Sequence, residues 1–202
     1  MSKHVLALFP TSVPFSLIQG KTEKINPDDF KFLPGGSDDG SLVTTDFRVL
    51  EKYPKLKKEL VSNFEEYSRE YLTYDQEYMI TTSWITAVDP GTQTEFHNHK
   101  NCFYSGVYYF QDYDSNSGQL EFLNPLLDFS SYNIVPREYN DASSLSWSIP
   151  PQKGKVVYFP SYLRHRVTKH GGKERRFSIA FNLIPVGSYG TQDSFHNTNW
   201  HT

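Results

Sequence analysis

Two histidines one residue apart, His97 and His99, are the side chains of this sequence best suited to chemistry. They end the run Gln93 to His99, which we predict to be a β-strand. On a strand, residues i and i+2 project from the same face. Imidazole nitrogens bind zinc, iron, copper and nickel. We therefore predict that the two rings bind one metal ion.

A third histidine, His165, follows in a later strand-like run. Three histidine ligands inside a β-barrel leave open positions on a metal for water or substrate, so such a site can catalyse a reaction. We predict a mononuclear metal site formed by His97, His99 and His165.

The segment Arg176-Phe177-Ser178 adds a candidate for anion binding. Gly171-Gly172 is typical of a two-residue hairpin turn, which would pair Val167 with Arg176 and His165 with Ser178. Arg176 would then lie on the same face as His165, roughly 7 Å along the sheet. Arginine binds carboxylates bidentately and stays charged. This spacing suits a small dicarboxylate held between metal and guanidinium.

The elements that must position these residues are mostly short strands. Eight runs with strand character follow Glu77, separated by turn residues. They are Tyr78–Val88, Gln93–His99, Phe103–Gln111, Gln119–Leu123, Leu145–Ile149, Lys155–Phe159, Leu163–Lys169 and Arg175–Ile184. We predict a mainly β protein, either a sandwich or a barrel.

The N-terminal part has a different pattern. Residues 4–18, with Pro10 and Pro14, suit an edge strand or an extended arm, and residues 19–41 suit a loop. From Asp46 to Tyr74 the apolar residues recur at helical spacing, and Pro54 is expected to split this stretch into two helices that pack on one face of the sheet. The long polar segment 124–144 is expected to be a lid or binding loop.

Composition limits the function classes. The 202 residues suit one domain, and 16% aromatic residues favour β-structure. A net charge of -3 gives no general attraction to nucleic acid or to an anionic membrane. The single cysteine, Cys102, excludes an intrachain disulfide and fits a reducing compartment. Val5–Phe9 is too short for a signal sequence, so we expect a cytoplasmic protein, for which a homodimer is one possible state.

Five segments, taken in order, resemble the iron(II)- and 2-oxoglutarate-dependent oxygenases found in marine phage and bacterial genomes. The resemblance extends from about Trp84 to Asn182. The segments are His97-x-His99; Ser105-Gly106-Val107-Tyr108-Tyr109-Phe110; Gly118-x-Leu120-x-Phe122-x-Asn124-Pro125; Gly154-Lys155-Val156-Val157-Tyr158-Phe159-Pro160-Ser161 with His165-x-Val167; and Arg176-x-Ser178-Ile179-Ala180-Phe181-Asn182.

This resemblance implies a double-stranded β-helix, also called a jelly roll, which is a cupin-like barrel. It implies that His97, His99 and His165 bind Fe(II), and that the keto acid end of 2-oxoglutarate chelates the iron. Arg176 and Ser178 would bind the far carboxylate. Tyr109 corresponds to the second residue of a Tyr-Tyr pair that contacts 2-oxoglutarate in some prolyl hydroxylases, and is a further candidate.

The implied activity is hydroxylation of a primary substrate, with 2-oxoglutarate decarboxylated to succinate. The substrate itself is not identified by the sequence, and both a peptide side chain and a small metabolite are compatible with it. We expect a single domain, 1–202, with an N-terminal arm, loop and helical buttress at 1–77, the catalytic core at 78–185 and a tail at 186–202.

One position departs from the wider superfamily, which has His-x-Asp or His-x-Glu where this sequence has His97-x-His99. Either three histidines hold the metal, as in some thiol dioxygenases, or a carboxylate such as Glu95 or Glu121 joins them. We favour three histidines, and a metal other than iron stays open.

Two alternatives remain. The first is a cupin-type metalloenzyme that does not use 2-oxoglutarate: Gly91 before His97-x-His99, and Gly154 and Pro160 before His165, resemble the two cupin motifs. However, the glutamate after the histidine pair and the asparagine four residues after the last histidine are missing. The second is a non-enzymatic β-sandwich binding module with incidental histidines. Histidine rings that converge on one point would count against it.

Overall fold

The computed structural model describes residues 10–18, 20, 22–35, 40–126 and 134–198. Within these residues the chain forms two β-sheets and one α-helix, which confirms the prediction of a mainly β protein. No helix in the described part is both long and apolar enough to cross a membrane.

The large sheet contains eight strands, ordered β1-β8-β5-β10-β4-β3-β2, with β11 paired to β10 beside this path. All of these strand pairs are antiparallel. The strands are β1 (Phe15–Leu17), β2 (Phe32–Pro34), β3 (Leu42–Thr44), β4 (Glu77–Val88), β5 (Tyr104–Tyr108), β8 (Lys155–Pro160), β10 (Arg176–Tyr189) and β11 (His196–Thr198).

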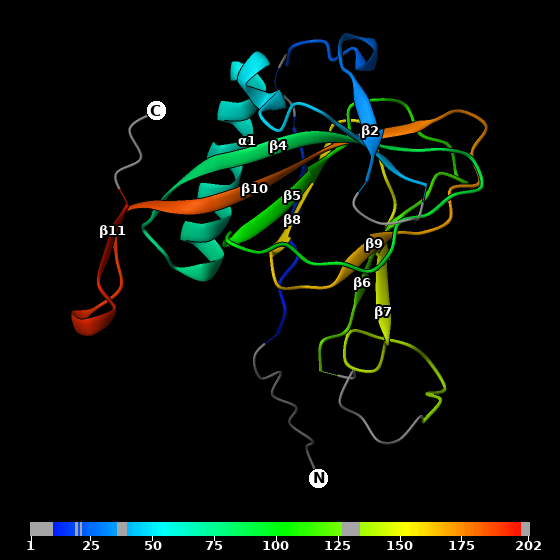
Figure 1. Ribbon diagram of the computed structural model, residues 1–202. Coiled ribbons are helices and arrows are strands. Elements are labelled where there is room, and N and C mark those ends of the chain that lie inside the picture. The colour runs from blue at the N-terminus through cyan, green and yellow to red at the C-terminus, as the bar shows by residue number, and fades with distance from the viewer. Residues whose placement is uncertain (1–9, 19, 21, 36–39, 127–133, 199–202) are drawn as a thin grey trace.

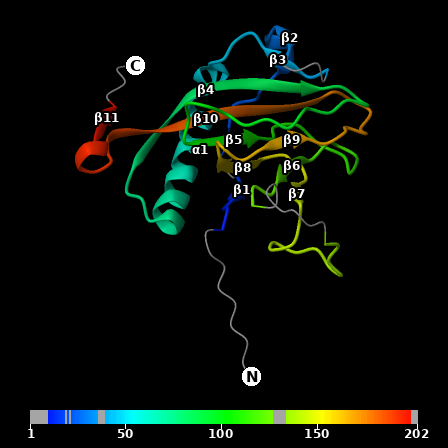
Figure 2. The same ribbon diagram turned by 60° about the horizontal axis from the view of Figure 1, so that its bottom comes forward.

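The small sheet has three antiparallel strands in the order β7-β6-β9. They are β6 (Leu120–Leu123), β7 (Ser146–Ile149) and β9 (His165–Val167). In both views of the molecule, β5 and β8 of the large sheet lie between this small sheet and helix α1 (Pro54–Tyr67) (Figures 1 and 2).

The helix buries one stripe of apolar side chains. Leu56, Leu60 and Phe64 recur at helical spacing and are fully buried in a cluster with residues of β4, β5, β8 and β10. The helix begins at Pro54, the proline at which the sequence predicts a break, and a 3-10 turn, Val49–Lys52, precedes it. Proline suits this first position because its missing N–H would have no partner there.

The opposite face of the large sheet meets the small sheet. Because side chains alternate along a strand, Val107, Val157 and Phe159 face away from the helix. They form a second apolar cluster with Leu120 and Phe122 of β6, among others. The two sheets therefore pack face to face, and the candidate functional residues project into the space between them.

The predicted hairpin at Gly171-Gly172 is wrong. Val167 pairs with Leu120 in the small sheet, whereas Arg176 pairs with Val88 in the large sheet. Residues 168–175 are therefore a connection between sheets. A longer-range constraint replaces the hairpin, since the backbone of His170 bonds to Gly91 and Thr92 instead.

Other predicted boundaries also shift. Gln93–His99 is not a regular strand; His97 forms only an isolated bridge with His165. The loop predicted at 19–41 contains β2, and β10 continues past residue 185 to pair with β11. β1 does occupy a sheet edge, as predicted. The predicted loop 124–144 lies partly outside the described residues, which exclude 127–133.

The packing of Phe64 generates a stability prediction. Its ring is fully buried and contacts the rings of Tyr78, Tyr104 and Tyr158. We expect Phe64→Ala to lower the free energy of unfolding by about 3–5 kcal/mol because it leaves a cavity. Urea denaturation monitored by circular dichroism measures this, with exposed Lys58→Ala on the same helix as the control. Equal stability of both variants would contradict the proposed core.

Candidate active site

His97 is positioned by a single antiparallel bridge to His165. The His97 N–H donates to the His165 carbonyl at 3.0 Å, and the His165 N–H donates back to the His97 carbonyl at 2.9 Å. Residues paired in this way project their side chains from the same face. Two residues on, the His99 N–H donates to the Ser161 carbonyl at 3.0 Å, which fixes the second histidine of the pair.

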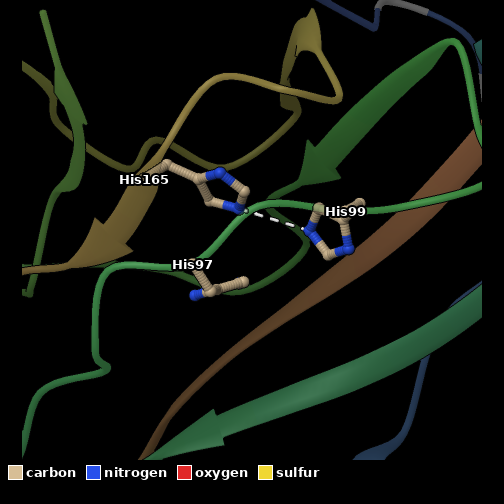
Figure 3. A group of neighbouring side chains, drawn as sticks. All are labelled: His97, His99 and His165. Atoms are coloured by element: carbon tan, nitrogen blue, oxygen red, sulfur yellow. Dashed lines mark hydrogen bonds between the residues drawn. The ribbon is translucent and has the colours of Figure 1, made fainter. Parts of the chain in front are cut away.

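The three imidazole rings converge at one point (Figure 3). One nitrogen from each ring lies within 4.8 Å of the other two, and the Nε2 atoms of His99 and His165 are 3.3 Å apart. His165 is buried, with 4% of its surface exposed, whereas His97 is exposed. The ring atoms could therefore hold an ion at the boundary between core and solvent.

Backbone carbonyls determine which nitrogen of two rings can bind a metal. His97 Nδ1 lies 2.8 Å from the Glu95 carbonyl, and His165 Nδ1 lies 2.9 Å from the Leu163 carbonyl. A carbonyl only accepts, so each Nδ1 carries the hydrogen and each Nε2 keeps its lone pair. Both rings are thus held in the tautomer that binds a metal through Nε2.

Burial keeps two of the rings uncharged. Desolvation, together with repulsion from neighbouring His97, lowers the pKa of His99 to about 4. The same two causes, with burial the larger, hold the pKa of His165 well below its usual value. Both groups are neutral near pH 7, which is the form that coordinates metal ions.

No carboxylate joins this group among the residues that the structure describes. Of the two glutamates considered from the sequence, Glu121 uses its oxygens elsewhere: one accepts from Arg166 at 2.6 Å and the other from Ser146 at 2.8 Å. Glu95 contributes its backbone carbonyl to His97. The described geometry therefore agrees with a ligand set of three imidazoles.

Arg176 is a buried guanidinium with an unused donor. It is 1% exposed; its Nε donates to the Gly118 carbonyl at 3.0 Å and its Nη1 donates to Ser178 Oγ at 3.3 Å. Its Nη2 has no hydrogen-bond partner among the residues that the structure describes. A buried charged group without full pairing costs considerable free energy, so this arrangement is suited to receiving an anion.

Tyr109 lies beside this guanidinium. It is fully buried, and its ring centroid is 5.4 Å from the Arg176 guanidinium carbon. Within the described part of the chain its hydroxyl also lacks a hydrogen-bond partner. Burial raises the pKa of the Tyr109 phenol, although the positive charge of Arg176 opposes that shift. The phenol therefore keeps its proton and can donate it to an anion in the same place.

One cavity of about 340 Å³ connects the two groups. The three histidines, Arg176 and Ser178 all line it, so these five predicted residues come together although the predicted hairpin does not exist. The sixth predicted residue, Tyr109, is not one of the lining residues. They meet because β9 and β10 face each other from different sheets. The arrangement can hold a metal ion and an organic anion in a single space.

The sequence reasoning missed two residues that serve this site, Thr94 and Gly118. Thr94 lines the cavity and accepts the N–H of Val167. Trp84 also lines the cavity, with its ring 5.6 Å from that of His99. Gly118 provides the carbonyl that holds Arg176. A turn signal marks Gly118, but nothing in its spacing indicates that contact.

A sequence model of the family described as "Putative 2OG-Fe(II) oxygenase" matches residues 82–182, which is half of the 202-residue chain. The chain belongs to this family of 2OG-Fe(II) oxygenases. Fe(II) and 2-oxoglutarate are accordingly its cofactors, and the three converging imidazoles could bind the metal. None of the curated protein sequences matches this oxygenase.

Solved structures of other oxygenases have a similar fold. HygX from Streptomyces hygroscopicus, solved with nickel, 2-oxoglutarate and hygromycin B, has a TM-score of 0.56 and 10% identity over 87% of this chain and 83% of its own. A Pseudomonas putida prolyl-4-hydroxylase has a TM-score of 0.52 and 14% identity, covering 77% and 78%. The carbocyclase SnoK from nogalamycin biosynthesis has a TM-score of 0.55 and 13% identity, covering 81% and 73%. At these identities the likeness concerns the fold alone.

The convergence of the rings predicts the effect of removing one. We expect His165→Ala to weaken the binding of Fe(II) or Ni(II) by more than roughly a hundredfold, since loss of a ligand exceeds the effect of changing an outer partner. Isothermal titration calorimetry under argon measures the affinity. The matched control is His196→Ala, which removes an exposed histidine far along the chain. Unchanged metal affinity in His165→Ala would exclude this ligand set.

The lowered pKa of His99 predicts a pH dependence of the metal-free protein. The unfolded chain takes up a proton near pH 6.5 and the folded one only near pH 4. The free energy of unfolding should therefore fall as pH falls through this window. Urea denaturation at several pH values should show a smaller decrease for His99→Gln than for the parent protein. Equal decreases would contradict the burial of His99 as a neutral base.

Proposed function

We propose that this oxygenase is an Fe(II)- and 2-oxoglutarate-dependent dioxygenase of the hydroxylase type, in which 2-oxoglutarate is decarboxylated to succinate. His97, His99 and His165 would hold the iron, and Arg176, Ser178 and Tyr109 would bind the cosubstrate. When bound, iron and 2-oxoglutarate supply the activation of dioxygen. The residues of this chain would position the metal and the cosubstrate and would exclude water from the cavity.

The observation that supports this proposal most strongly is that one cavity contains both a group of three histidines that could hold a metal ion and an arginine that could bind an anion. Three imidazole nitrogens lie within 4.8 Å of one another, with no metal-binding carboxylate among the described residues. The same cavity is lined by Arg176, and in the described part of the chain neither its Nη2 nor the hydroxyl of the neighbouring Tyr109 has a hydrogen-bond partner. A dicarboxylate with a keto acid end complements both, because one end binds metal and the other binds arginine.

The roles of the anion-binding residues follow from their atoms. Arg176 donates from Nη2 to a carboxylate oxygen, and Tyr109 donates from its hydroxyl to the same group. Ser178 Oγ already accepts from Arg176 Nη1, so its own hydroxyl hydrogen is available to the carboxylate. The walls of the second apolar cluster, including Val107 and Phe159, keep water from this end of the cavity.

The two facing sheets support a double-stranded β-helix, or jelly roll, buttressed by the N-terminal helix, as one domain with its catalytic core at 78–185. Within the class, the primary substrate is proposed as a peptide side chain or a small metabolite. The cupin-type alternative shares the histidines but does not account for the buried guanidinium of Arg176, whose Nη2 has no partner among the described residues. A binding module with incidental histidines does not account for the convergence of three rings.

Anaerobic titration with Fe(II) and 2-oxoglutarate tests the proposal. We expect a visible metal-to-ligand charge-transfer band for the parent protein. Arg176→Gln should weaken 2-oxoglutarate binding on the order of a hundredfold because it removes charge-assisted hydrogen bonds. The matched control is Arg175→Gln, because the neighbouring guanidinium forms an exposed ion pair with Asp89 at 2.6 Å.

Two results would contradict the proposal. Absence of the band at saturating keto acid in the parent protein would favour the cupin alternative. Equal loss of 2-oxoglutarate affinity in the Arg175 and Arg176 variants would remove Arg176 from its proposed role.

A further inference from the structure

His170 is a buried titratable side chain outside the metal group. Only 2% of it is exposed. Its Nε2 lies 2.7 Å from the Glu174 carbonyl, while the N–H groups of Gly118 and Gly172 point at its Nδ1 from 3.3 and 3.4 Å. A carbonyl only accepts and an amide N–H only donates. The ring is therefore neutral, with its hydrogen on Nε2 and its lone pair on Nδ1.

This tautomer links His170 to the guanidinium of Arg176. Gly118 donates its N–H to His170 and accepts, through its carbonyl, the N–H of Arg176 Nε at 3.0 Å. Glu174, which accepts from the other ring nitrogen, lies two residues before Arg176 at the start of β10. One imidazole thus fixes both the backbone that leads into Arg176 and the carbonyl that holds its side chain.

Close contacts with Gly172 and backbone hydrogen bonds hold the His170 ring in its observed orientation. A Cβ on Gly172 would lie 2.5 Å from His170 Cε1, so the ring occupies the space that glycine leaves open. A Cβ on Gly118 would lie 2.5 Å from the Thr168 carbonyl. The His170 backbone is fixed as well, since its N–H donates to Thr92 at 2.8 Å and its carbonyl accepts from Gly91 at 2.7 Å. The whole connection between the two sheets is built around this residue.

We propose that His170 is a positioning residue that orients Arg176 for the far carboxylate of a keto diacid. The inference rests on the proposed function. The hydrogen bonds of Nε to Gly118 and of Nη1 to Ser178 fix the orientation of the guanidinium. Among the described contacts, Nη2 is then the donor that remains for a ligand. Without the His170 acceptor, the Gly118 N–H loses its partner, and the peptide group that carries the Gly118 carbonyl is then held only by the Gln119 N–H, which donates to Thr168 Oγ1 at 2.9 Å.

Two ligands isolate this role. 2-Oxoglutarate and 2-oxobutyrate share the keto acid end, but only the first has a far carboxylate. Calorimetric titration of the Ni(II)-loaded protein gives both affinities without turnover. The ratio of the 2-oxoglutarate affinity to the 2-oxobutyrate affinity reports only on the binding of the far carboxylate. In the parent protein we expect the ratio to favour 2-oxoglutarate strongly.

Three variants separate the two ring nitrogens. His170→Leu removes all three hydrogen bonds of the ring and should lower the ratio on the order of tenfold, with Ni(II) and 2-oxobutyrate affinities unchanged. His170→Gln places its amide at the Nε2 position and should behave similarly. His170→Asn places its Oδ1 at the Nδ1 position, restores the acceptor for Gly118 and should keep most of the ratio. The control, Lys173→Ala, changes an exposed residue in the same connection.

The proposal is overturned if folded His170→Leu keeps the parent ratio, or if the variants lose Ni(II), 2-oxobutyrate and 2-oxoglutarate affinity in equal proportion, which is the result of a merely structural role. Nitrogen NMR of the parent protein adds a test that needs no variant: the hydrogen must be on Nε2 of His170, and a hydrogen on Nδ1 excludes the relay. A parent protein without preference for 2-oxoglutarate would instead refute the proposed function itself, and the inference with it.

Discussion

The reciprocal backbone hydrogen bonds between His97 and His165 are the constraint on which the candidate site depends. Residues 93–99 form no regular strand, so no sheet ladder holds this segment. A single bridge ties it to the small sheet, and the bond from His99 to Ser161 ties it to the end of β8. Three ring nitrogens meet because two peptide groups are paired at this point.

The second constraint is the burial of a guanidinium between two sheets. Folding removes Arg176 from water and gives it the Gly118 carbonyl and Ser178 Oγ, both of which are uncharged. Its ion-paired neighbour Arg175 stays near the surface with Asp89. The interior therefore contains a guanidinium that is not paired with a carboxylate in these contacts, and under the proposed function the far carboxylate of 2-oxoglutarate would offset the cost of its desolvation.

Much of this could be predicted from residue types, and less from local pattern. Strand-like runs bounded by turn residues located β4, β5, β6, β8 and β10, although β5 and β8 are buried along their whole length and show no alternation of burial. The histidine pair was found through a strand that does not exist, yet residues i and i+2 still share a side because His97 and His99 are each tied by backbone bonds to neighbouring strands. Gly171-Gly172 led to a wrong hairpin prediction because a turn signal reports only on neighbouring residues. The path of the chain here is set instead by hydrogen bonds of His170 to Gly91, Thr92 and Gly118, which are far away in the sequence. Contacts between residues far apart in the chain leave no mark in spacing.

The uneven exposure of the three imidazoles has a consequence for metal selection. His165 belongs to the core, while His97 stands at the surface, so one side of the coordination position is open to exchange with bulk solution. Sites made only of neutral nitrogen donors bind copper and nickel more tightly than ferrous iron. For an ion held by these three proposed ligands, selection of iron would then depend on the metal supply and on the chelating keto acid, because the nitrogen donors alone do not favour iron.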